Sequence, residues 1–231
     1  MLSLRRSRAA PPPGQLRALS IGLGLGAVGA LGALPARSGA ADSLALLTWL
    51  ALVAAPAGYL YGAARADLLR FGAVAPACWM VALALADAPS PTGLATPVWA
   101  AAVATGLFFA GAALGRLWSE AMWAGAGALF LCMSLSSGLA LRGGAWSTPW
   151  PPATAAVLLD LSPVTLVCES AGVRDWMWRE GVYEPAGVDR LTRRPWRGSL
   201  AGPTVLVVGC ALAACFSRIG RRDASGKEPS R

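Results

Sequence analysis

Six apolar stretches, each close to the length of a membrane span, divide this sequence and constrain its fold more than any other feature. An α-helix needs about 20 consecutive apolar residues to cross the hydrocarbon core of a bilayer. The chain is 55% hydrophobic and 14% charged, whereas a soluble domain is roughly 25% charged. The stretches are residues 18–36, 43–62, 71–88, 97–115, 122–141 and 200–217. We therefore expect an all-α, polytopic membrane helix bundle with about six transmembrane helices.

The basic residues predict the orientation of this bundle. They gather in an N-terminal tail (1–17) and a C-terminal tail (218–231), and cytoplasmic flanks of membrane helices are rich in Lys and Arg. We expect both tails in the cytoplasm, five spans within 18–141, a long outer loop over 142–199 and the sixth span at 200–217. Arginines in that loop count against this orientation, but the two basic tails and an even number of spans agree with it. The expected location is the cytoplasmic (inner) membrane, with the lipid bilayer as the main partner.

The N-terminal region also resembles a secretory signal, because a basic start and an apolar core are followed by the small residues Ser38-Gly39-Ala40. Cleavage there would leave the rest of the topology unchanged. An uncleaved first helix is the simpler interpretation. Six tryptophans fall near predicted span ends, as in the aromatic belts of membrane proteins: Trp99, Trp118, Trp123, Trp146, Trp150 and Trp196.

Several kinds of chemistry lack the residues that they need. The chain has no histidine, and its five cysteines contain no CxxC pair, which argues against imidazole metal sites and His-activated nucleophiles. The only lysine, Lys227, lies in a polar tail, so a GxxxxGK[ST] phosphate loop is absent. We expect no enzyme activity, no catalytic residue, no cofactor and no metal site. Carboxylates such as Asp160 and Glu169 keep a membrane-embedded enzyme as a minor alternative, and the tails lack the aromatic platform of nucleic-acid binders.

Small residues recur on two predicted helices. The sequence GLGAVG matches GxGxxG, but it lies inside an apolar helix rather than between a strand and a helix, so a dinucleotide site is rejected. Gly22, Gly26 and Ala30 recur every four residues, and Gly111 and Gly115 form a second such pair. This spacing allows two helices to approach closely. Packing within the chain is the simpler interpretation, and contact in a homodimer is the alternative.

Residues 158–172, LLDLSPVTLVCESAG, do not fit a spanning helix. Ser162 followed by Pro163 is a helix start, and Gly172 is a plausible stop. The helix between them, of about nine residues, would be roughly 14 Å long and too short to span. Its apolar residues Val164, Val167, Cys168 and Ala171 share one face, while Thr165 and Glu169 share another. We expect a re-entrant or interfacial element between the fifth and sixth spans, with the apolar face shielded and the polar face wet.

The sequence LSPVTLVCE, from Leu161 to Glu169, resembles a phrase found in permease subunits of type-2 ABC transporters, where L-N-P-L-T-Y-L-x-E is typical. The matching positions are Leu161, Pro163, Thr165, Val167 and Glu169, with Ser162 where Asn is common. The resemblance covers residues 122–222. It implies six spans, a separate ATPase subunit, two copies of the bundle and a lipid, glycan or drug as substrate. The alternative is a structural or assembly membrane protein that binds a partner and transports nothing.

Overall fold

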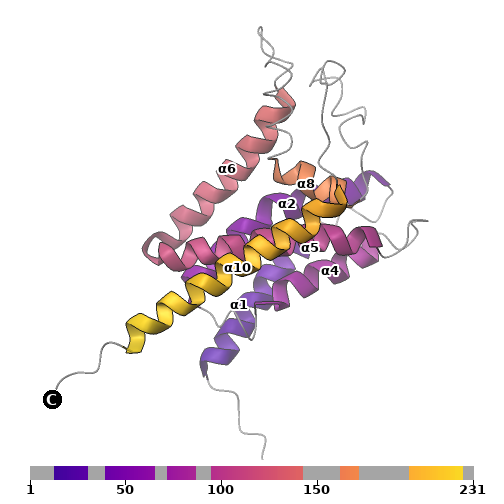
Figure 1. Ribbon diagram of the computed structural model, residues 1–231. Coiled ribbons are helices and arrows are strands. Elements are labelled where there is room, and N and C mark those ends of the chain that lie inside the picture. Colours follow the sequence, from indigo (N-terminus) through magenta and orange to yellow (C-terminus); the bar gives the residue numbers. More distant parts are fainter. Residues whose placement is uncertain are drawn as a thin grey trace, which may run out of the picture.

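In a computed structural model the chain is a bundle of helices (Figure 1). The structure describes residues 13–30, 40–65, 72–86, 95–142, 162–171 and 198–225, and these residues contain no strand. The helices are α1 (Pro13–Ala30), α2 (Ala40–Ala63), α4 (Val74–Ala86), α5 (Ala95–Leu117), the 3₁₀ turn η3 (Ser119–Ala121), α6 (Met122–Arg142), α8 (Pro163–Ser170) and α10 (Gly198–Ser225).

Every predicted apolar stretch overlaps one of these helices, but only three of the described helices are long and apolar enough to cross a membrane. The three segments are Ala45–Ala63, Val98–Leu117 and Ser119–Gly138. By length and composition the chain is therefore a membrane protein. The apolar parts of α1, α4 and α10 are shorter; the 13 residues of α4 extend only about 20 Å, against a hydrocarbon core of about 30 Å. The six-span arrangement thus stays a prediction.

Helix α5 is the central element, with extensive contacts to α2 on one side and α10 on another. The core between these helices consists mainly of alanine, leucine and a cluster of aromatic rings. The ring of Phe108 lies 5.6 Å from the centroid of Trp79 and 5.7 Å from that of Tyr61. All three side chains are fully buried, so this cluster joins α2, α4 and α5.

Glycines set the distance between α2 and α5. A Cβ atom on Gly58 would overlap the carbonyl oxygen of Phe108, and one on Gly62 would overlap that of Ala112. The glycines of α5 show the same close contact from the other side: a Cβ on Gly111 or Gly115 would overlap a carbonyl oxygen of α2. Backbone therefore packs on backbone, as in close helix pairs of membranes. Since residue numbers rise together along both helices, α2 and α5 run in the same direction.

The predicted glycine positions on α1 also lie inside the bundle. A Cβ on Gly26 would stand 2.8 Å from Cβ of Cys78 on α4. Gly22 is buried, and the side chain of Ala30 lies outside the described part of the chain. The indole nitrogen of Trp49 on α2 donates a hydrogen bond of 2.9 Å to the carbonyl oxygen of Val28. Together with Gly111 and Gly115 on α5, Gly26 faces another helix of the same chain.

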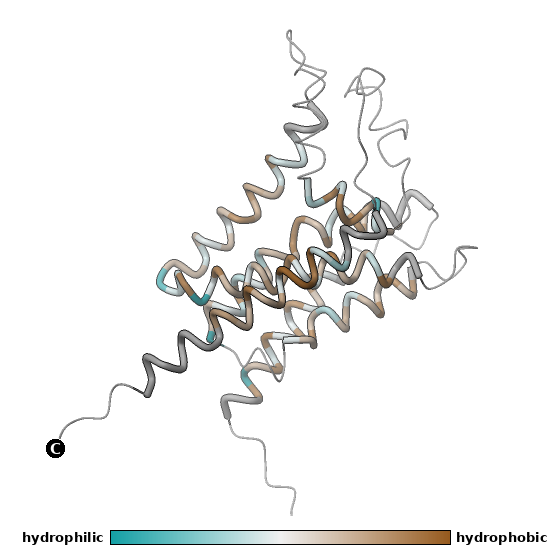
Figure 2. Tube along the Cα trace, in the orientation of Figure 1, coloured by the Kyte–Doolittle hydropathy of each residue, from teal (hydrophilic) through white to brown (hydrophobic). Residues whose placement is uncertain are grey.

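Helix α6 diverges from the other helices after its first turns (Figure 1). Its spanning segment is 11% buried, compared with 72% for that of α2. The first turns pack against Tyr59, because a Cβ on Gly125 would overlap the Tyr59 ring. The Tyr59 hydroxyl donates a 2.6 Å hydrogen bond to the carbonyl oxygen of Trp118. Figure 2 shows a hydrophilic turn between α5 and α6 and apolar residues along both helices.

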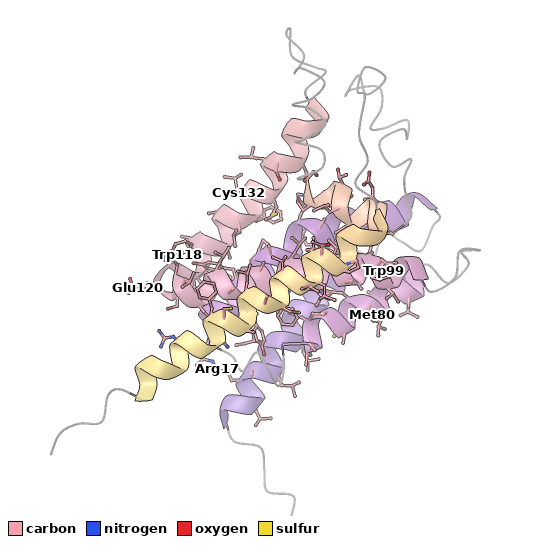
Figure 3. The ribbon with its side chains drawn as sticks, in the orientation of Figure 1. Arg17, Met80, Trp99, Trp118, Glu120 and Cys132 are labelled. Atoms are coloured by element: carbon pink, nitrogen blue, oxygen red, sulfur yellow. The ribbon has the colours of Figure 1, made fainter. Side chains whose placement is uncertain are left out.

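Tryptophans mark the two ends of α5. Trp99 and Trp118 are both exposed, and they lie at opposite ends of the helix (Figure 3). Their separation along α5 is about 28 Å at 1.5 Å per residue, close to the thickness of the hydrocarbon core. This spacing suits α5 as a span with an aromatic residue at each interface.

Candidate functional site: the short helix α8

The helix α8, which lies in the segment between α6 and α10, begins where the sequence predicts. Ser162 has an extended backbone (φ −68°, ψ 124°), and its hydroxyl oxygen accepts a hydrogen bond of 3.4 Å from the backbone N–H of Thr165. Pro163 occupies the first turn, where the missing N–H costs nothing. The helix ends at Ser170, and the N–H of Ala171 donates to the carbonyl oxygen of Val167. Ala171 is the C-cap, so the expected stop, Gly172, is the next residue, the position at which a terminating glycine usually lies; Gly172 itself lies outside the described residues.

Helix α8 packs into the bundle against α2, α5, α6 and α10. Val167 and Cys168 have no exposed surface, and Pro163 and Val164 are also buried. Val164, Val167 and Cys168 belong to the same buried cluster as the α2 and α5 side chains. Of the expected apolar face, Val164, Val167 and Cys168 are covered by protein, whereas Ala171 is partly exposed.

The expectation for the polar face is wrong at Thr165. Its side chain is fully buried, whereas only Glu169 on that face is partly exposed. The reason is that α8 is covered from more than one direction, so that a division into one buried and one wet face does not apply. The Thr165 hydroxyl oxygen has no hydrogen-bond partner, and such an unpaired buried group costs about 1–3 kcal/mol.

A hydrogen bond joins α8 to α6. The Ser162 hydroxyl donates to the hydroxyl oxygen of Ser137 at 3.2 Å, and Ser137 in turn donates to the carbonyl oxygen of Met133 at 2.9 Å. Ser162 thus caps α8 and binds α6 with the same oxygen atom. The sequence does not identify Ser162 as the partner of Ser137, because a serine in a membrane helix can bond a carbonyl of its own helix or a neighbouring helix, and Ser137 does both.

Besides the Cys168 thiol and the partly exposed Glu169 carboxylate, the polar groups of this site are hydroxyls. In the described part of the chain the buried polar residues are Ser137, Ser162, Thr165 and Ser170. Hydroxyls donate and accept hydrogen bonds but do not ionise near neutral pH. Among the residues that the structure describes, no group of three or more His, Cys, Asp or Glu side chains is placed to hold a metal ion. The site is therefore one of packing and hydrogen bonding.

The remaining predicted residues are distributed as follows. Ser162, Pro163, Thr165, Val167 and Glu169 all belong to α8 or its cap. Leu161, which the resemblance also includes, lies outside the described residues, as does most of the predicted outer loop 142–199.

Comparisons with protein-family models, with curated proteins and with solved structures found no match.

Proposed function

We propose that this chain is a permease-like membrane subunit of an ABC-type transporter, with six spans and a separate subunit that hydrolyses ATP. The observation that supports the proposal most is α8. It is a short, capped helix that follows α6, precedes α10 and packs into the bundle, which is the place and kind of element that the resemblance at Leu161–Glu169 implies. In this proposal α8 is the re-entrant element at the outer end of the bundle.

The direction of the helices supports the six-span topology. Helices α2 and α5 contain the second and fourth apolar stretches and run in parallel, as the glycine contacts establish. Alternate spans of a polytopic protein must run in the same direction. Helices α1, α4 and α10, whose apolar parts are shorter, pack against this pair; in this proposal they cross the membrane with flanking residues or through a locally thinner bilayer. Both termini then lie in the cytoplasm, and reporter fusions at Arg231 and near Tyr183 report opposite sides.

A disulfide trap at the contact between α6 and α8 tests the transport function. In a cysteine-free background, Ser137→Cys and Ser162→Cys place two thiols where the hydroxyls now touch. The full chain is purified from its native membranes together with the proteins bound to it. We expect a co-purifying ATPase and a cross-linking rate that changes at least threefold when ATP and vanadate are added. Gly127→Cys with Ser162→Cys is the control pair, because a Cβ on Gly127 would meet no other atom within 4 Å.

The composition of the interior favours a second candidate, a structural or assembly protein of the membrane. The buried polar side chains of the described chain are all hydroxyls, whereas ion-coupled transport usually employs charged residues inside the membrane. If this candidate is correct, no ATPase co-purifies, ATP and vanadate leave the cross-linking rate unchanged, and the chain purifies with another membrane protein.

A further inference from the structure

One end of the bundle carries exposed arginines from two helices. Arg17 lies near the start of α1, and Arg65 follows the end of α2; both are exposed. The turn between α5 and α6 lies at this end as well, together with the C-terminal end of α10 (Figures 1 and 3). The contact of Tyr59 with Trp118 joins the ends of α2 and α5 there.

Arg65 has a backbone conformation that disfavours arginine. Its φ is +51°, the only positive value among the described residues other than glycine. Its N–H bonds the carbonyl oxygen of Gly62 and closes α2, a position at which glycine is the usual residue. A side chain in this conformation costs about 1 kcal/mol or more. A residue that carries such a cost is a candidate for a functional role, and what arginine adds over glycine is a positive charge.

Exposed apolar side chains lie at the same end. Trp118 and Trp123 are 63% and 73% exposed, and Leu117 beside them is 46% exposed. Tryptophan on a lipid-facing surface belongs at the level of the headgroups. Arg17 and Arg65 lie at the same end of the bundle as these tryptophans, the end at which the tryptophans would place lipid headgroups. Glu120, also exposed, is the acid in this turn.

Helix α10 continues beyond its apolar part at this end. The apolar part ends at Phe216, but the helix continues to Ser225, a further length of about 13 Å. Arg218, Arg221 and Arg222 stand at positions i, i+3 and i+4 of this extension, a spacing that places them on one face of a helix. The sequence supplies one acid there, Asp223.

We propose that this end of the bundle, formed by Arg17, Arg65 and the α10 extension, binds the headgroups of anionic phospholipids. Basic residues next to a membrane helix attract anionic lipids. A lipid partner is favoured over an acidic protein because the arginines lie at the same end of the bundle as exposed tryptophans, which suit a bilayer interface. The inference depends on membrane insertion but not on transport.

Spin-labelled lipids measure this preference directly. The full chain is reconstituted in phosphatidylcholine vesicles with either spin-labelled phosphatidylglycerol or spin-labelled phosphatidylcholine, and electron paramagnetic resonance gives the fraction of each lipid held at the protein. We expect phosphatidylglycerol to associate about three- to tenfold more strongly, and 1 M salt to remove most of this preference because the Debye length falls to about 3 Å. Equal association of the two lipids, or a preference that salt does not change, overturns the proposal.

Two sets of variants connect the preference to these residues. The change Arg218→Gln with Arg221→Gln and Arg222→Gln should reduce it at least threefold, and adding Arg17→Gln and Arg65→Gln should remove it. The corresponding lysine variants keep the charge and should keep the preference. If the glutamine variants retain the preference, or if the lysine variants lose it, the proposal is wrong. The five positions lie at helix ends or beyond the apolar segments, and circular dichroism checks that each variant is folded.

Discussion

The hydroxyl of Ser162 donates a hydrogen bond to the hydroxyl of Ser137, with 3.2 Å between the two oxygen atoms. The same Ser162 oxygen caps α8 by accepting from the N–H of Thr165. One side chain therefore fixes both the start of α8 and its attachment to α6. Two of the most specific interactions of the candidate site depend on this atom.

Replacing Ser162 should cost more than replacing Ser137. Ser162→Ala removes a helix cap, at about 1 kcal/mol, and also the bond to α6. Ser137→Ala removes only the bond between helices, and such bonds contribute on average about 0.6 kcal/mol inside membranes. Thermal unfolding in detergent of both single variants and of the double variant gives the coupling between the residues. A coupling of zero would contradict the hydrogen bond.

The glycine contacts between α2 and α5 predict a second difference. Gly62→Ala and Gly111→Ala each place a methyl group on a carbonyl oxygen of the facing helix, so the helices must separate, at about 1–3 kcal/mol. Gly127→Ala on α6 is the matched control, because its Cβ would meet nothing within 4 Å. We expect lower unfolding temperatures for the first two variants and an unchanged or higher one for the control. Equal effects at all three positions would refute the close packing.

Two threonines in the bundle should respond oppositely to loss of the hydroxyl group. Thr165→Val removes a buried hydroxyl without a partner, so we expect an unchanged or greater stability. Thr105→Val removes a hydroxyl that donates 2.6 Å to the carbonyl oxygen of Ala101, with an expected loss of about 0.5–1.5 kcal/mol. Denaturation in mixed micelles compares the two variants. A larger loss at Thr165 than at Thr105 would show that Thr165 has a partner after all.

The backbone at Arg65 predicts a stabilising substitution. Arg65→Gly relieves the positive φ and should raise stability by about 1 kcal/mol. Ala64→Gly, one residue earlier, relieves no such strain and should be neutral or destabilising. Thermal unfolding distinguishes the two variants. If arginine binds lipid at this position, Arg65→Gly also lowers the preference for phosphatidylglycerol, so that stability and lipid binding change in opposite directions.

Thiol reactivity tests the burial of α8. Cys132 on α6 is exposed and Cys168 on α8 is fully buried, so in micelles N-ethylmaleimide should modify Cys132 at least tenfold faster. In a cysteine-free background, Thr165→Cys should react as slowly as a thiol restored at position 168. Glu169→Cys should react faster, because Glu169 is partly exposed. A fast reaction at position 165 would restore the division into an apolar and a wet face.

The sequence predicts those features of the site that depend on residues close together in the chain. The start of α8 was predictable because a serine cap and a proline act within one helical turn. The burial of Thr165 was not, since it depends on where α2, α5 and α10 lie around α8. The same holds for the glycines: their spacing predicts close packing at Gly111, but neither its partner α2 nor the matching positions Gly58 and Gly62 were identified from the sequence. Counting apolar residues predicts six spans, but the apolar parts of α1, α4 and α10 are shorter than a span.

The parallel contact of α2 and α5 has a consequence for biosynthesis. Gly58 and Gly62 have their packing partners on α5, which the ribosome makes only after α4. At about 5–20 residues per second, α2 waits several seconds beside the translocon with its glycine face uncovered. The α2–α5 contact therefore cannot form as a hairpin of two consecutive helices. Ribosomal stalling before α5 would leave a nascent intermediate without its central helix, a natural substrate for membrane quality-control proteases.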